Sequence, residues 1–191
     1  MKKLLFLLTL LLTAPVTYAQ QAAAPALPLD PATHLVTYSG VVNVPGATRG
    51  ELYARASAWA ASRYKADGDA LQVQDKVKSK IVVKGYTKAL VNGRDCGPVG
   101  HMLSISIKEG VYQYEVTNFA NTHPTPAGEY GMGPFENEKP HLALAYADDI
   151  TNALVQKNWN ALRSNTDADV KTMLAYLQVA MTNATQDKSE F

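Results

Sequence analysis

Hydrophobic and polar residues alternate along several short stretches of the chain. In residues 34–44, one set of alternate positions is apolar or small, namely Val36, Tyr38, Gly40, Val42 and Val44. A period of two places successive side chains on opposite faces of a strand. The same alternation returns in residues 70–75, 80–90, 99–108 and 111–119. The pattern therefore predicts five strands.

One amphipathic helix is predicted between the first and second strands. Thr48 and Glu51 have the spacing of a capping box, in which the hydroxyl and the carboxylate accept hydrogen bonds from free amides at a helix start. The residues that follow carry an apolar stripe at helical spacing, made of Leu52, Ala56, Trp59, Ala60 and Tyr64. This stripe predicts a helix that packs against the sheet.

Two more helices are predicted after the last strand. Residues 142–163 and 167–184 each carry apolar side chains at helical spacing. Residues 120–140, which precede them, are rich in Pro and Gly and are predicted to form a long loop. The four strands after the first helix follow one another through short links, so we expect an antiparallel meander. The order of elements predicts an α+β fold.

Composition changes the picture at the amino terminus. Lys2 and Lys3 precede a short apolar run at residues 4–12, and Ala19 completes a cleavage site of small residues. We interpret residues 1–19 as a secretory signal peptide that is cut after Ala19. A membrane anchor is the alternative, but the run is about half of the roughly 20 residues that span a bilayer. The mature chain is expected to be periplasmic or secreted, with no transmembrane segment.

The rest of the chain is predicted to form one domain. Residues 20–33 are rich in Ala and Pro, which predicts a flexible leader. The periodic stretches place a single domain at residues 34–181 and leave a polar tail at residues 182–191. A chain of 191 residues is long enough for one domain with an ordinary hydrophobic core.

The charge of the chain is close to neutral. It has 18 basic and 17 acidic side chains, a formal net charge of +1. Removing Lys2 and Lys3 with the signal peptide leaves 16 basic residues and a net charge of −1. Nucleic-acid-binding domains usually carry a clear basic excess. The balance therefore argues against a general polyanion binder.

Three segments carry a resemblance to a known family. They are "VVNVPGATRGELYARASAWAASRY", "KIVVKGY" and "ISIKEGVYQYEVTNF". With the order β-α-β-β-β-β-α, they resemble a family of exported bacterial proteins of unknown function with a TATA-box-binding-protein-like (TBP-like) fold. The resemblance spans residues 37–119 and implies a curved antiparallel sheet packed on helices, with an additional C-terminal helix here. It supplies no catalytic residues.

Five lysines gather in one predicted hairpin: Lys76, Lys78, Lys80, Lys84 and Lys88. The fold name suggests DNA binding, and phosphate contacts do use lysines. Minor-groove saddles insert apolar side chains between base steps, however, whereas this face is predicted to carry Lys, Gln, Ser and Glu. We expect no nucleic-acid partner and interpret the lysines as a solvated face that opposes edge-to-edge aggregation.

The residues that could bind metal or react as a thiol give weak signals. Cys96 is the single cysteine, predicted to lie in a turn at residues 92–98 as a small, partly buried side chain or as a reactive thiol. The chain has four histidines, His34, His101, His123 and His141. The long loop also contains three glutamates, Glu129, Glu136 and Glu138. Their spacing matches no metal-binding motif, so no metal or other cofactor is expected.

The sequence contains no catalytic motif of a known type. A Gly-x-Ser-x-Gly elbow, a Gly-x4-Gly-Lys phosphate loop and a His-Glu-x-x-His helix are absent. We expect a non-catalytic binding or interaction module of the bacterial envelope. An uncharacterised hydrolase is one alternative, because convergent triads leave no signature in sequence order.

The other alternative is a small-molecule carrier with a pocket for an apolar ligand between sheet and helix. Trp59, Tyr112 and Tyr114 are the aromatic candidates for such a pocket, although core packing is the simpler interpretation of their spacing. A carrier predicts a cavity on the order of several hundred cubic ångströms beside Trp59. An interaction module predicts a filled core and an exposed apolar patch.

Overall fold

The computed structural model describes residues 26–64, 71–91, 93–121, 131–141 and 149–183. Its elements follow the chain as β1 (Tyr38–Asn43), α1 (Arg49–Arg63), β2 (Leu71–Asp75), β3 (Lys80–Val91), β4 (Arg94–Lys108), β5 (Val111–Asn121), β6 (Gly133–Pro134) and α2 (Asp149–Thr182). The proposed signal peptide lies outside the described residues, as do His123, Glu129 and most of the polar tail.

The strands form one antiparallel sheet in the order β1-β5-β4-β3-β2. Consecutive strands from β2 to β5 are neighbours, which confirms the predicted meander. β1 pairs with β5 and so forms one edge of the sheet, while β2 forms the other. The sixth strand, β6, pairs with the end of β5 and was not predicted, since it is only two residues long within the Pro- and Gly-rich segment.

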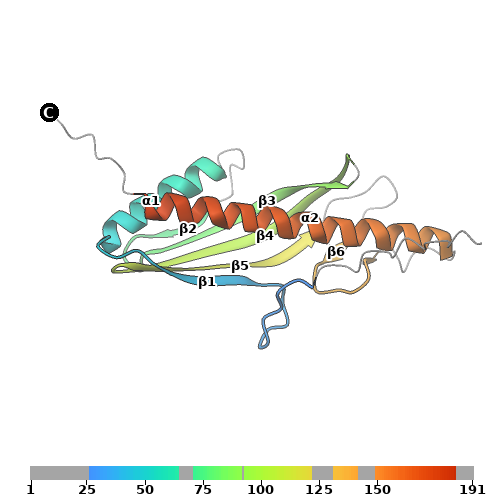
Figure 1. Ribbon diagram of the computed structural model, residues 1–191, viewed down its shortest axis with the longest axis horizontal. Coiled ribbons are helices and arrows are strands. Elements are labelled where there is room, and N and C mark those ends of the chain that lie inside the picture. The colour runs from blue at the N-terminus through green and yellow to red at the C-terminus, as the bar shows by residue number, and fades with distance from the viewer. Residues whose placement is uncertain (1–25, 65–70, 92, 122–130, 142–148, 184–191) are drawn as a thin grey trace, which may run out of the picture.

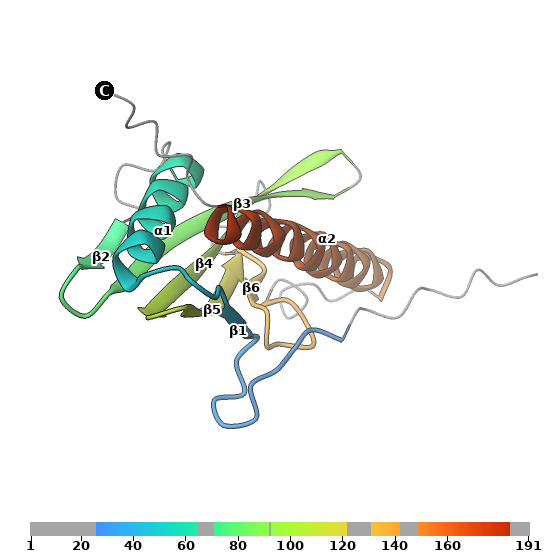
Figure 2. The same cartoon turned by 60° about the vertical axis from the view of Figure 1, so that its left-hand side comes forward.

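Both helices lie on the same side of the sheet (Figures 1 and 2). The predicted alternation is confirmed on the strands beneath them, where Ile81, Leu103, Ile105 and Val116 are fully buried. The opposite face of the sheet is not covered by any described element. This face carries exposed side chains, including Lys80, Lys84, Gln113 and Glu115.

Helix α1 begins at the predicted capping box. The amide of Glu51 donates to Thr48 Oγ1 at 3.2 Å, and the amide of Thr48 donates to Glu51 Oε2 at 2.7 Å. Leu52, Ala56 and Ala60 are buried against the sheet as expected. Reciprocal capping satisfies two amides at the helix start and fixes the point at which the chain turns from β1 into α1.

Helix α2 corrects the prediction of two C-terminal helices, since residues 149–182 form one continuous helix. Its buried stripe is Trp159, Leu162, Thr166, Val170, Met173, Leu177 and Met181. Thr166 is 3% exposed and occupies a core position with a polar residue, so the apolar pattern breaks there although the helix does not. The segment contains neither Gly nor Pro, and weaker helix formers cost only about 0.5 kcal/mol each.

The start of β4 also differs from the prediction. The turn predicted at residues 92–98 is shorter, because β4 begins at Arg94 and Cys96 lies within the strand. The register of β3 and β4 shifts between Lys88 and Leu90, and Gly97 has a φ of +81°. A bulge of this kind lets the ladder continue through residues that, in sequence, are typical of a turn.

The end of the predicted leader packs against the domain. Leu27 is buried, Leu29 forms a bridge with Val36, and the amide of Thr37 donates to the carbonyl of Pro28 at 2.9 Å. The structured part of the chain therefore extends at least to Leu27, on the amino-terminal side of the predicted boundary at residue 34.

Candidate functional site

The three aromatic residues proposed for a ligand pocket do not meet in one place. Trp59 is partly buried, and its ring packs edge-on against Tyr64 with centroids 6.2 Å apart. Tyr112 is 1% exposed and belongs to the core. Tyr114 is partly buried and lies over Gly40, where an added Cβ would come within 2.6 Å of its hydroxyl oxygen. Of three hollows formed by described residues, none is lined by Trp59.

The largest of these hollows, which we call the hairpin hollow, lies by the turn between β4 and β5 and has a volume of about 760 Å³. Val41, Gln113 and Ser106 are register neighbours on β1, β5 and β4, so their side chains share the uncovered face of the sheet. The complete lining is Val41, Arg49, Lys78, Ser106, Ile107, Lys108, Glu109, Val111, Tyr112 and Gln113. Residues from β1, α1, the β2–β3 turn, β4 and β5 thus meet at this end of the sheet.

Cationic side chains dominate the charge of the hairpin hollow. Arg49, Lys78 and Lys108 line it together with one acidic residue, Glu109. The Glu109 carboxylate already accepts a hydrogen bond from the Arg49 amide at 3.0 Å. Lys78 lies 3.8 Å from the Asp75 carboxylate, but its side chain remains 80% exposed. The hollow therefore combines an excess of positive charge with apolar side chains from Val41 and Val111.

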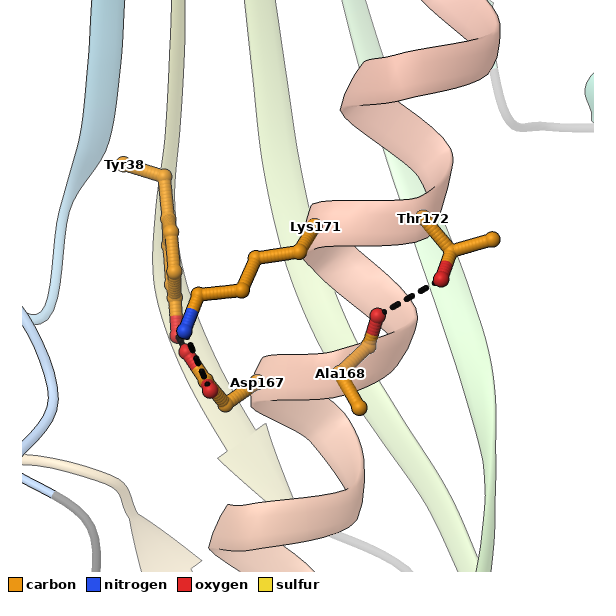
Figure 3. A network of polar contacts seen from close by, with 5 residues as sticks. All are labelled: Tyr38, Asp167, Ala168, Lys171 and Thr172. Atoms are coloured by element: carbon orange, nitrogen blue, oxygen red, sulfur yellow. Dashed lines mark hydrogen bonds and ion pairs between the residues drawn. The ribbon is translucent and has the colours of Figure 1, made fainter.

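A second hollow, the edge groove, runs between β1 and α2 and has a volume of about 500 Å³. Its lining consists of Pro28, Thr37, Tyr38, Ser39, Tyr114, Lys171, Leu174, Ala175 and Gln178. Figure 3 shows the polar contacts beside it, where the Tyr38 hydroxyl donates to Asp167 Oδ1 at 2.8 Å. Lys171 donates to Asp167 Oδ2 at 2.7 Å. Burial, together with the hydrogen bond to Asp167, raises the pKa of Tyr38, so its hydroxyl stays protonated and acts as a donor.

His101 is the only described histidine in the core, and it is 2% exposed. Its Nε2 lies 3.1 Å from the Tyr64 hydroxyl, which also contacts Met173 Sδ at 3.2 Å. Burial, assisted by the positive charge of Arg63, lowers the pKa of His101 to about 4. His101 is therefore a neutral core residue at neutral pH, with a tyrosine rather than a serine or cysteine as its neighbour.

Two of the residues considered for metal binding, Glu136 and His141, are held by other contacts. Glu136 accepts a hydrogen bond from the Val36 amide at 2.9 Å, and His141 Nε2 lies 3.1 Å from Asn137 Nδ2. Within the described ranges, no group of three His, Cys, Asp or Glu residues could hold a metal ion. Cys96 is partly buried, and its carbonyl accepts from Asn121 Nδ2 at 3.0 Å.

The packing between sheet and helices bears on the choice between a carrier and an interaction module. The space between sheet and helices is occupied by one buried cluster that includes Leu52, Leu103, Phe119 and Trp159. Exposed apolar side chains occur outside it, and they include Val41 on β1 and Tyr176 with Val179 on α2. Among the described residues the core is thus filled, and the exposed apolar side chains lie on separate elements.

The hairpin hollow was not foreseen from the sequence. Arg49 and Lys108 are 59 positions apart, and no local pattern indicates that a helix start and a hairpin turn share one surface. The lysines were foreseen better, because Lys76, Lys78, Lys80 and Lys84 are exposed as predicted. No helix within the described ranges is long and apolar enough to span a membrane.

Comparison with known proteins agrees with this fold. A TBP-like protein from Parabacteroides distasonis superposes with a TM-score of 0.60 at 20% identity, over 84% of this chain and 98% of that one. A DUF4468 family protein from Bacteroides ovatus superposes with a TM-score of 0.59 at 15% identity, over 83% of this chain and 92% of that one. At these identities the likeness shows the fold alone. No curated protein matches the sequence.

The family assignment comes from the sheet and its first helix. Residues 38–121, from the start of β1 to the end of β5, match a family model described as a domain of unknown function (DUF4468) with TBP-like fold. The match confirms the resemblance seen in the sequence and covers nearly the same residues. This segment of the chain therefore belongs to the DUF4468 family, whose function is unknown.

Proposed function

We propose that the chain is an exported, non-catalytic binding module of the bacterial envelope, and that the hairpin hollow is its ligand site. The observation that carries the proposal is a hollow of about 760 Å³ whose lining includes Val41, Ser106 and Gln113, on the face of the sheet that both helices leave uncovered. Its volume falls within the range of roughly 300–1,000 Å³ that is typical of small-molecule sites. Export is supported by the charged and apolar amino-terminal residues.

The charges in the hollow favour an anionic ligand. Arg49, Lys78 and Lys108 outnumber the single carboxylate of Glu109, which is hydrogen-bonded to a backbone amide. Val41 and Val111 add apolar surface to the same lining. A small organic anion with an apolar part, such as a carboxylate on a hydrocarbon or aromatic body, complements both features.

A non-catalytic role is supported by what surrounds His101 and His141. A nucleophile is usually activated by a base within hydrogen-bonding reach. His101 contacts Tyr64 and is buried, while His141 contacts Asn137. These contacts provide no serine or cysteine nucleophile, so they favour binding over the hydrolase alternative.

Titration of the purified chain with 8-anilinonaphthalene-1-sulfonate, a fluorescent anion with an apolar body, tests this function. We expect saturable binding that weakens with added salt, because screening reduces attraction between exposed charges. The double variant Lys78→Gln/Lys108→Gln should bind the probe about tenfold more weakly, a change of roughly 1.4 kcal/mol.

The control removes the same charge elsewhere on the surface. Lys139 and Lys157 are exposed and do not line the hollow. The double variant Lys139→Gln/Lys157→Gln should therefore bind the probe like the unchanged chain. Equal weakening in both double variants, or no weakening in the first, would reject the hollow as the site. The mass of the purified chain tests export, since loss of residues 1–19 is expected and a full-length product would contradict it.

A further inference from the structure

The edge of the sheet at β1 has backbone groups without a strand partner. The amide of Val44 donates to Gly110 on the β5 side, whereas the amide of Thr37 donates to Pro28 on the opposite side. Amides alternate in direction along a strand. Ser39, Val41 and Asn43 therefore direct their amides and carbonyls away from β5. No described strand pairs with them there.

This edge lacks the features that usually protect an exposed strand. Charged side chains, prolines and bulges commonly prevent pairing with another chain. Residues 35–48 contain no charged residue, and β1 pairs with β5 in unbroken register. The opposite edge, β2, has a register irregularity and leads into a turn with Asp75, Lys76 and Lys78. Only β2 of the two edges has such protection.

We propose that β1 is the docking edge for a second copy of this chain, and that the two β1 strands pair antiparallel about Val41. In this register Val41 faces the second copy's Val41, and Ser39 faces its Asn43. The outward-directed backbone groups of Ser39, Val41 and Asn43 are then paired on both strands, with about six backbone hydrogen bonds in total. An interface with twofold symmetry uses the same surface on both copies, which this register satisfies.

The register also accounts for side chains on both faces of the sheet. Val41 is 66% exposed on the uncovered face, and pairing places the second copy's Val41 directly beside it. On the helix side, the second copy's Val42 comes opposite Gly40. Gly40 presents no side chain there, and the edge groove next to it is lined by Tyr38, Tyr114 and Leu174. The Tyr114 ring lies over Gly40, so the incoming Val42 side chain meets apolar aromatic surface at the border of the groove.

The unpaired part of the β1 edge has the same length as the strand that would pair with it. Pro28 occupies the edge at Thr37, so pairing with another strand is limited to the residues beyond it. In the proposed register, the second copy's Pro45 comes opposite Thr37. Pro45 lies just past the end of β1, at a Pro-Gly turn where the chain leaves the sheet. The paired length therefore ends where the edge is already occupied, which favours a second copy over a longer extended peptide.

Sedimentation of the full chain, expressed from Met1 and purified, tests this interface. We expect a concentration-dependent dimer. Val41→Lys should weaken association at least about tenfold, because two like charges would meet across the twofold axis. Gln113→Lys is the matched control: Gln113 is the register partner of Val41 on β5, and the change adds a lysine to the same face one strand from the edge. Its association should stay within about twofold of the unchanged chain.

A cross-linking experiment examines the register itself. In a Cys96→Ala background, Val41→Cys should form a disulfide-linked dimer on mild oxidation, because paired strands bring such Cα atoms within roughly 5.5 Å. Gln113→Cys should not, since two further strand spacings separate its copies. A chain that stays monomeric, a dimer insensitive to Val41→Lys, or a dimer that Val41→Cys fails to link would overturn the proposal. None of these measurements uses a ligand, so this interface and the hairpin hollow can fail independently.

Discussion

At the scale of single residues, Gly85 shows how closely the sheet approaches the first helix. A Cβ at this position would overlap the ring of Tyr64 and lie 2.9 Å from His101 Nε2. Gly85 is buried in the middle of β3, where glycine is normally unfavourable. Its presence allows the Tyr64–His101 pair to lie close against the strand.

Gly85→Ala should therefore lower the free energy of unfolding by about 1–3 kcal/mol, the usual range for overpacking a core. Gly50→Ala provides the control, because Gly50 lies in the first turn of α1 and an added Cβ there meets no atom within 4 Å. That change should stabilise the chain by about 0.4–1 kcal/mol. Urea unfolding of the two variants measures both effects, and a Gly85→Ala variant as stable as the unchanged chain would contradict the packing described.

At the scale of elements, the contact between β1 and α2 depends on Tyr38 and Asp167 more than on Lys171. Tyr38→Phe removes the hydroxyl donor to a partly buried carboxylate and should cost about 1–2 kcal/mol in the free energy of unfolding. Lys171 is 67% exposed, so Lys171→Gln should cost less than about 0.5 kcal/mol. Denaturant titration compares them, and an equal loss in both variants would contradict this assignment, because the Lys171–Asp167 ion pair lies within α2 and only the Tyr38 hydroxyl crosses from the strand to the helix.

The elements also show which parts of the fold could be predicted from sequence. Strand faces and the capping box were predicted correctly, because alternation and cap spacing are local signals. The split of α2 was wrong because Thr166 places a polar side chain in the buried stripe. The predicted start of β4 was too late, because the residues around the bulge at Gly97 resemble a turn in sequence. In both places the structure depends on packing and strand pairing, which a local sequence pattern does not show.

The candidate site was harder to predict than the fold. Trp59, Tyr112 and Tyr114 were grouped by residue type, but in the structure Trp59 is partly buried on α1, Tyr112 is in the core and Tyr114 lines the edge groove. The hairpin hollow is instead lined by Arg49, Lys78 and Lys108, which come from three separate segments. Such a combination becomes visible only when the meander and the position of α1 are known.

At the scale of the whole molecule, one row of aromatic rings connects the helices through the core. Neighbouring ring centroids lie 5.2–6.2 Å apart along Trp59, Tyr64, His101, Phe119, Phe135 and Trp159. The row begins on α1, crosses β4 and β5, passes the segment after β6 and ends on α2. His101 is its one titratable imidazole, so protonation at this point affects packing that involves both helices.

The stability of the domain should therefore depend on pH through His101. Its folded pKa is about 4, below the value of about 6.5 for an unfolded histidine, so the unfolded chain binds the proton first as pH falls. Stability present at pH 7 is then lost between about pH 6.5 and pH 4, with a change of about 2 kcal/mol from pH 7 to pH 5. His101→Gln removes this titration, and denaturant unfolding at the two pH values should show a smaller difference, whatever the variant's absolute stability. His141→Gln, at an exposed position, should keep the full pH dependence. If His101→Gln loses as much stability between pH 7 and pH 5 as the unchanged chain, protonation of the buried imidazole is not what couples the core to pH.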